Sequence, residues 1–124
     1  MTRGVRGATT VKHNEENQII KETRKVLEEM VSINDIKPEC ISHVFISATI
    51  DLNAGFPAKA LRELPGFTYV PVMCMSEIDV PGALPFCIRI MMVVNTEKEQ
   101  KEIHHVFHNE AVKLRPDLIE DRGE

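Results

Sequence analysis

The clearest hydrophobic pattern in the chain is a stretch of helical periodicity over residues 14–32. Apolar residues recur there at intervals of three and four, and charged residues fill the other positions, which predicts one long amphipathic helix. His13 or Asn14 stands where a cap is needed, and Glu15 and Glu16 fall in the first turn, where the helix dipole favours carboxylates. We therefore expect the start of this helix to be well defined.

Five other segments have the short apolar or alternating patterns that are typical of strands. They are rich in β-formers and are bounded by turn residues such as Pro65-Gly66 and Val80-Pro81-Gly82. The strands are predicted at 2–11, 42–49, 67–73, 86–95 and 103–108. Two short helices are also expected, one at 56–64 with Pro57 in its first turn and one at 109–114.

Together these elements predict an α+β fold, with a five-stranded sheet and one long helix. A single long helix covers only one face of such a sheet, and monomers rarely leave the other apolar face in water. Oligomerisation through the uncovered face is therefore the simplest expectation.

The length and composition narrow the class of protein. A chain of 124 residues forms one domain. The net charge is −4, and no run of basic residues is longer than two, so nucleic acid and anionic membranes are not expected partners. The longest apolar stretch, 88–94, is interrupted by Arg89, and no export signal or membrane span is expected.

The cysteines indicate a reducing compartment. Cys40, Cys74 and Cys87 are odd in number and contain no Cys-x-x-Cys pair, which argues against a disulfide framework and against a zinc ribbon. We therefore expect a cytoplasmic protein.

Familiar catalytic and metal-binding motifs are absent from the sequence. It contains no phosphate-binding glycine loop, no nucleophile elbow and no His-Glu-x-x-His. His104 and His108 would share a face of a strand but lie about 13 Å apart, too far to share a metal ion. No metal or cofactor is expected.

Two arginines stand out because their surroundings are apolar. Arg6 lies in the first predicted strand and Arg89 in the middle of the most apolar one. An unpaired buried guanidinium costs several kcal/mol, so each needs an anionic partner. Two simple interpretations are open for Arg89: an ion pair within the chain, or an edge residue whose guanidinium extends to solvent. Glu77 is the obvious carboxylate for such an ion pair, but a plain loop carboxylate is the commoner case for a residue of this kind.

Taken together, the cations suggest a binding site. With Glu77 as the main acid among them, they would form a pocket for a small dianion, either carboxylate or phosphate. The cations of this set are Arg6, Lys59, Arg62, Arg89 and Arg115.

Five groups of residues, in order from about residue 2 to 118, are similar to the motifs of a known family. They are 3–11 (RGVRGATTV), 47–52 with 56–64 (SATIDL and FPAKALREL), 69–72 with 74–77 (YVPV and CMSE), 87–92 (CIRIMM) and 114–118 (LRPDL). In these segments the chain resembles the AroH-type monofunctional chorismate mutases. The resemblance implies one domain over 1–118 with a flexible acidic tail at 119–124. It also implies a five-stranded mixed sheet that assembles as a homotrimeric pseudo-α/β barrel, with active sites between adjacent subunits.

The resemblance also implies a reaction. Such enzymes convert chorismate to prephenate in phenylalanine and tyrosine biosynthesis, on the shikimate pathway, by a Claisen rearrangement without cofactor, metal or covalent intermediate. The protein must hold the substrate in its compact conformer and present a preorganised cation to the charge that develops as the C–O bond breaks.

Roles for individual residues follow from the same resemblance. Arg89 would be the catalytic cation at the ether oxygen, Arg6 would bind a substrate carboxylate, and Glu77, with Cys74 beside it, would accept a hydrogen bond from the ring hydroxyl. The neighbouring subunit would supply a wall made of Phe56, Ala58, Lys59, Arg62, Val72 and Met73. The C-terminal segment that closes over the ligand would contain Leu114 and Arg115.

The sequence departs from the family pattern at two positions. Phe107 stands where many relatives carry a tyrosine whose hydroxyl reaches a substrate carboxylate, so carboxylate binding would depend more on Arg6. Met73 stands where a threonine is frequent. Neither departure touches the expected catalytic cation, and activity is expected to survive.

Two other functions remain open at this point. One is a trimeric carboxylate-binding or regulatory module that kept the pocket and lost turnover, against which the joint presence of Arg6, Glu77 and Arg89 argues. The other is enamine or imine hydrolysis, which rests on fold analogy alone and would need Glu77 to activate water.

Overall fold

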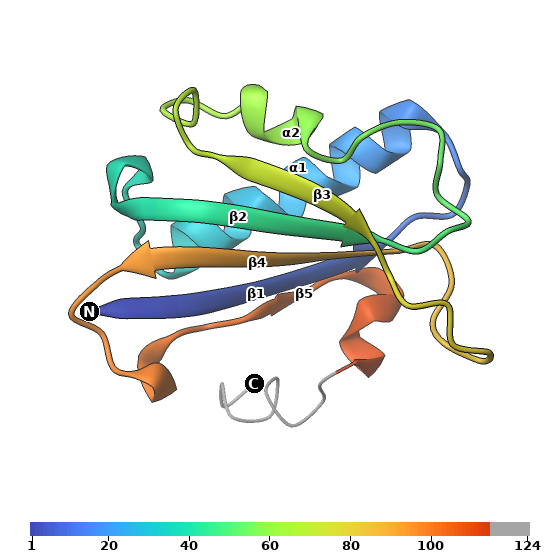
Figure 1. Cartoon of the computed structure of the whole chain (residues 1–124). Helices are drawn as coiled ribbons and strands as arrows, with labels where there is room; N and C mark the ends of the chain where they lie inside the picture. Colours follow the sequence, from blue (N-terminus) through green and yellow to red (C-terminus); the bar gives the residue numbers. More distant parts are fainter. Residues whose placement is uncertain (115–124) are drawn as a thin grey trace.

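A computed structural model of the chain describes residues 1–114 (Figure 1). Its helices are α1 (Glu16–Ile33), α2 (Lys59–Arg62) and the 3-10 helices η1 (Pro38–Cys40), η2 (Gln100–Glu102) and η3 (Asn109–Lys113). Its strands are β1 (Thr2–Thr10), β2 (Ile41–Ala48), β3 (Val72–Ser76), β4 (Cys87–Asn95) and β5 (Val106–Phe107). Arg115 and the tail expected at 119–124 lie outside the described residues.

The five strands form one mixed sheet in the order β3-β2-β4-β1-β5. Strand β4 pairs antiparallel with both β1 and β2, while the outer pairs β2·β3 and β1·β5 are parallel. Along β1 the antiparallel ladder runs without a break from Thr2 opposite Asn95 to Thr10 opposite Cys87. The prediction of a five-stranded mixed sheet with one long helix is confirmed.

Helix α1 covers one face of this sheet and lies behind the strands in the view of Figure 1. Its apolar side buries Val26, Leu27 and Met30 in the main core. The helix approaches β1 so closely that a Cβ atom on Gly7 would clash with the sulfur of Met30 and with Val26. Glycine at this position therefore permits the contact between helix and sheet.

The opposite face of the sheet is largely uncovered in the single chain, as the sequence predicted. Large apolar side chains project from it at more than a third of their full exposure, namely Phe45 (40%), Met73 (63%), Met75 (43%) and Met91 (38%). We call this surface the open face. Among residues 1–114 it is covered at one end, where Ala111 of η3 packs against Ala8 and Phe107.

Several boundaries differ from the sequence predictions. Helix α2 is a single turn rather than the expected 56–64, and Pro57 precedes its N-cap residue, Ala58. Strand β3 begins at residue 72 and not at 67, because residues 67–70 form a turn closed by the Val70 amide on the Phe67 carbonyl (3.1 Å). Phe67 is buried in the core. Strand β5 has two residues instead of 103–108.

The start of α1 also differs from the prediction. Its N-cap is Glu15, which forms no side-chain capping bond. The Asn14 side chain instead accepts hydrogen bonds from the backbone amides of Asn53 and Ala54, at 3.1 and 3.0 Å. Asn14 therefore connects the helix entrance to the loop that leads to α2.

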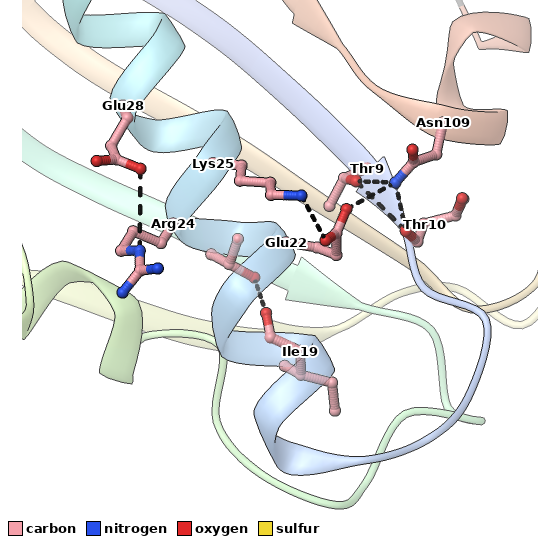
Figure 2. Close-up of polar contacts among 9 residues, drawn as sticks. Thr9, Thr10, Ile19, Glu22, Arg24, Lys25, Glu28 and Asn109 are labelled. Atoms are coloured by element: carbon pink, nitrogen blue, oxygen red, sulfur yellow. Dashed lines mark hydrogen bonds and ion pairs between the residues drawn. The ribbon is translucent and has the colours of Figure 1, made fainter.

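Helix η3 is attached to the sheet and to α1 through Asn109 (Figure 2). The Asn109 amide nitrogen donates to Thr9 Oγ1 (3.1 Å), to the Thr10 carbonyl (3.0 Å) and to Glu22 Oε1 (2.9 Å). Asn109 has a left-handed backbone with φ of 55°, which asparagine tolerates better than most residues. These bonds fix the position of η3 against the sheet and α1. Within residues 1–114, no helix is both long enough and apolar enough to cross a membrane.

Candidate active site

The centre of the candidate site is a cluster of three polar side chains on the open face. Arg89 of β4 stands opposite Ser47 of β2 in the strand register, and Glu77 follows directly after β3. Glu77 Oε2 lies 3.2 Å from Arg89 Nε and accepts a 2.6 Å hydrogen bond from the Ser47 hydroxyl. The backbone amide of Glu77 donates to the Ala48 carbonyl at 2.9 Å, which extends the pairing of β2 with β3 by one step. The predicted pairing of Arg89 with Glu77 is confirmed.

The guanidinium of Arg89 is only partly engaged by this carboxylate. The Nε atom of Arg89 is buried and lies within ion-pair distance of Glu77. Its N–H is nevertheless not aligned to donate a hydrogen bond to the carboxylate. The Arg89 side chain is still 40% exposed, whereas that of Glu77 is 19% exposed. Arg89 is therefore held at the open face with exposed surface left to meet an anion.

Cys87 lies two residues before Arg89 on the same side of β4 and is fully buried. Burial raises the pKa of its thiol, and the neighbouring Arg89 offsets this only in part. The thiol is therefore protonated at neutral pH, and it does not compete with Glu77 as a second anion for Arg89.

The second arginine, Arg6, lies on the same face of the neighbouring strand. Arg6 pairs with Met91 and Ala8 with Arg89, so the two arginines are diagonal neighbours across the β1·β4 ladder. The Arg6 guanidinium lies over the Phe107 ring, with 5.7 Å from Cζ to the ring centroid, in a cation–π arrangement. The Arg6 backbone amide also donates to Nδ1 of His105 at 2.9 Å, which continues the β1·β5 contact beyond the two paired residues of β5.

These side chains form one group, which we call the open-face group. It consists of Arg6, Glu77, Arg89 and Phe107, each of which the sequence had singled out. Leu114, also expected at the site, packs against the small cluster formed by Ala8, Phe107 and Ala111. The structure therefore brings together residues from β1, β4, β5 and the segment after β3.

The remaining expected site residues gather elsewhere, around α2 and the edge strand β3. We call them the edge group, and they are Phe56, Ala58, Lys59, Arg62, Val72 and Cys74. A pocket of about 410 Å³ lies beside them, and two members of the group, Phe56 and Cys74, are in its lining. Lys59 forms an exposed ion pair with Glu16 of α1 at 2.7 Å.

Cys74 lies on the opposite side of the sheet from Glu77. It pairs with Ile46, whose side chain is in the core, and it packs against that same core. Burial raises the pKa of the Cys74 thiol, and its hydrogen bond with the backbone of Ala58 offsets this in part. Met73, the residue before it, turns to the open face. Within one chain the expected site is therefore divided into two groups that do not face each other.

Two of the histidine side chains make structural contacts. His105 accepts the bond from Arg6 already described, and His108 Nε2 lies 3.1 Å from Glu29 Oε1 of α1. In the part of the chain that the structure describes, no three histidine, cysteine or acidic side chains are close enough to hold a metal ion.

Ser47 is the member of the central cluster that no feature of the sequence distinguishes. A serine within the motif SATIDL has no distinguishing pattern by itself. Its alternation with Phe45 places it on the same face of β2 as that exposed residue, but only the register of β2 with β4 reveals that it faces Arg89.

Comparison with known proteins places these features in a family context. A family model described as chorismate mutase type I matches residues 2–118. A relative named chorismate mutase AroH from Bacillus subtilis (strain 168) is 52% identical over 118 residues, which is 95% of this chain and 93% of the relative. One of the same name from Thermus thermophilus is 41% identical over 119 residues, covering 95% and 97%. Among solved structures, a chorismate mutase from Clostridium thermocellum matches with a TM-score of 0.85 at 48% identity, over 88% of this chain and 96% of that one.

Proposed function

Because the chain belongs to the type I chorismate mutase family and is an isomerase of that kind, we propose that it converts chorismate to prephenate at the open-face group. The reaction is a Claisen rearrangement, in which one C–O bond breaks while one C–C bond forms within the same molecule. No proton or electron is exchanged with the protein. The protein therefore contributes through binding, orientation and electrostatics.

Arg89 carries the proposal, because it is a cation anchored on a rigid central strand and still partly exposed. Negative charge develops on the ether oxygen as the C–O bond breaks, and a fixed cation facing that oxygen stabilises the transition state more than the ground state. Glu77 and Ser47 hold the site before substrate arrives, so little reorganisation is needed during the reaction. Such a preorganised donor typically contributes about 3–4 kcal/mol.

Glu77 is suited to a second role toward the ring hydroxyl of chorismate. Its Oε2 is occupied by Ser47 and Arg89, whereas its Oε1 has no hydrogen-bond partner within residues 1–114. An ionised carboxylate is a strong acceptor, so Oε1 would accept a hydrogen bond from the ring hydroxyl. This contact would orient the ring relative to Arg89.

Arg6 is proposed to bind a carboxylate of the substrate. A guanidinium matches a carboxylate in a bidentate geometry, and the Phe107 ring under Arg6 limits its orientations. Phe107 has no hydroxyl to share this task, so the affinity for the carboxylate depends on Arg6 and on other cations of the site.

We further propose a homotrimer in which each active site lies between two subunits. The open-face group and the edge group lie apart in one chain, but a neighbouring copy that covers the exposed apolar residues of the open face would bring its edge group to them. That neighbour would add Lys59 and Arg62 as cations and Phe56 as an apolar wall, with Leu114 and Arg115 closing the site. A reducing cytoplasm is proposed as the compartment, since the three cysteines are unpaired.

The decisive experiment is the rate of chorismate conversion to prephenate for the parent, Arg89→Lys and Arg89→Ala. Arg89→Ala should lower kcat by roughly 100- to 1000-fold, as does loss of a transition-state donor in other enzymes. Arg3→Ala is the matched control, since Arg3 lies on β1 and donates from Nε to the Lys98 carbonyl (2.9 Å), away from the open-face group. The electrostatic account fails if Arg89→Ala, folded and assembled like the parent, stays within a few-fold of the parent rate. A monomer in light scattering would contradict the proposed assembly.

A further inference from the structure

Among the three polar side chains at the centre of the site, Arg89, Glu77 and Ser47, the shortest contact is made by the Ser47 hydroxyl. It donates to Glu77 Oε2 at 2.6 Å, and the same oxygen lies 3.2 Å from Arg89 Nε. Ser47 stands directly opposite Arg89 in the antiparallel ladder and beside Met75 of β3 in the parallel one. One carboxylate oxygen is thus shared between a neutral donor on β2 and a cation on β4.

The two donors differ in how well they are aligned. The Ser47 hydroxyl meets hydrogen-bond geometry, whereas the buried Arg89 Nε does not, despite its ion-pair distance. A carboxylate beside a guanidinium would otherwise favour a bidentate pair with it. By occupying Oε2, Ser47 keeps Glu77 from closing fully onto Arg89.

We propose that Ser47 is a positioning residue of the mutase reaction, acting through Glu77. Its hydroxyl sets the orientation of the Glu77 carboxylate, which leaves Oε1 open to the ring hydroxyl of the substrate and leaves the Arg89 guanidinium available to the ether oxygen. Without this hydroxyl, Glu77 turns toward Arg89, and both groups lose their preorganised placement. The inference rests on the function proposed above.

The sharpest test compares Ser47→Thr with Ser47→Val. The two side chains have the same branched shape and both suit a strand, but only threonine keeps the hydroxyl. Ser47→Val, like Ser47→Ala, should lower kcat roughly 10- to 100-fold, as expected for misplaced catalytic groups, while Ser47→Thr should recover most of the parent rate. The Thr and Val variants should both unfold cooperatively, and their stabilities should differ by no more than the loss of one hydrogen bond, because their bulk in the strand is the same.

A double-mutant cycle with Glu77→Gln separates positioning from a general effect on the fold. A neutral amide is not drawn onto Arg89, so Ser47→Val should change kcat by less than about two-fold in the Glu77→Gln background. An equal loss in both backgrounds would overturn the inference, as would a Ser47→Val enzyme within about two-fold of the parent.

The parent and Arg89→Ala are measured in the same assay. An inactive parent, or an Arg89→Ala variant that is as active as the parent, would refute the proposed function itself. An active parent with a normal Arg89 effect and an unaffected Ser47→Val variant would refute only the role of Ser47.

Discussion

If Arg89 and Arg62 serve the same active site from different subunits, two inactive variants should restore activity when they assemble together. Arg89→Ala damages the open-face group, and Arg62→Ala damages the edge group. In the proposed trimer each site combines the open-face group of one subunit with the edge group of the next. A site is therefore intact when its open-face half comes from an Arg62→Ala chain and its edge half from an Arg89→Ala chain.

The expected magnitude follows from this geometry alone. In a random mixture of equal amounts, each half of a site is undamaged with a probability of about one half, so about a quarter of all sites are intact in any closed ring. The mixed assembly should thus reach about 25% of the parent specific activity, from two components that are each nearly inactive.

The assay uses the two variants carrying different affinity tags, co-expressed and purified through both tags, with prephenate formation as the readout. Mixed trimers that pass both tags contain each kind of chain, so the purified activity should be at or above that of the random mixture. The matched control combines Arg89→Ala with Glu77→Ala, two lesions in the same group, for which no arrangement of subunits rebuilds a site. The proposed division of the site is refuted if the first mixture is no more active than its components, or if the control mixture recovers equally.

Three further predictions concern single positions. Phe107→Tyr should leave kcat similar or lower KM, because the new hydroxyl lies where a carboxylate donor would help; a large loss would show that this buried ring has no room for it. Gly7→Ala should lower the free energy of unfolding by about 1–3 kcal/mol in urea titrations, since its Cβ would clash with Met30, and an unchanged midpoint would contradict the packing argument. Burial raises the pKa of Glu22, but the Asn109 hydrogen bond and nearby lysines outweigh it and bring the pKa below its ordinary 4.5. Its contribution to stability is therefore present above pH 4.5 and lost as pH falls through the lowered pKa, so Glu22→Gln should flatten this part of the acid unfolding curve, and identical curves would contradict it.

Elements with strong local patterns were predicted well, and those that depend on distant pairing were not. Helix α1 and strand β4 have long apolar periodicities, and both lie within two residues of their predicted bounds. Strand β5 is short because only residues 106 and 107 pair with β1. The segment 67–70 has the composition of a strand, yet it forms a turn that buries Phe67. Composition alone does not distinguish these outcomes.

In the candidate site, too, contacts that depend on strand register could not be predicted from the sequence. The pairing of Arg89 with Glu77 was predictable, because a guanidinium in an apolar strand requires an acid and Glu77 was at hand. The position of Ser47 was not, since its partner depends on the register of β2 with both neighbouring strands. The resemblance places Cys74 beside Glu77, whereas within one chain the alternation of β3 puts these two side chains on opposite sides of the sheet.

The alternation along β3 would let one short strand serve two active sites of the proposed trimer. The Met73 side chain lies on the open face, whereas the Cys74 side chain packs on the core and lines the 410 Å³ pocket. Glu77, after the strand ends, lies on the open face again. In the proposed trimer, Cys74 and Glu77 of one chain would therefore contact different substrate molecules, although they are three residues apart. A shift of β3 along β2 would move Cys74 in the wall of one site and, at the same time, the Glu77 carboxylate in another. The parallel ladder of β2 with β3, which the Glu77 amide extends onto Ala48, opposes such a shift, so both sites of the proposed trimer would depend on a rigid edge strand.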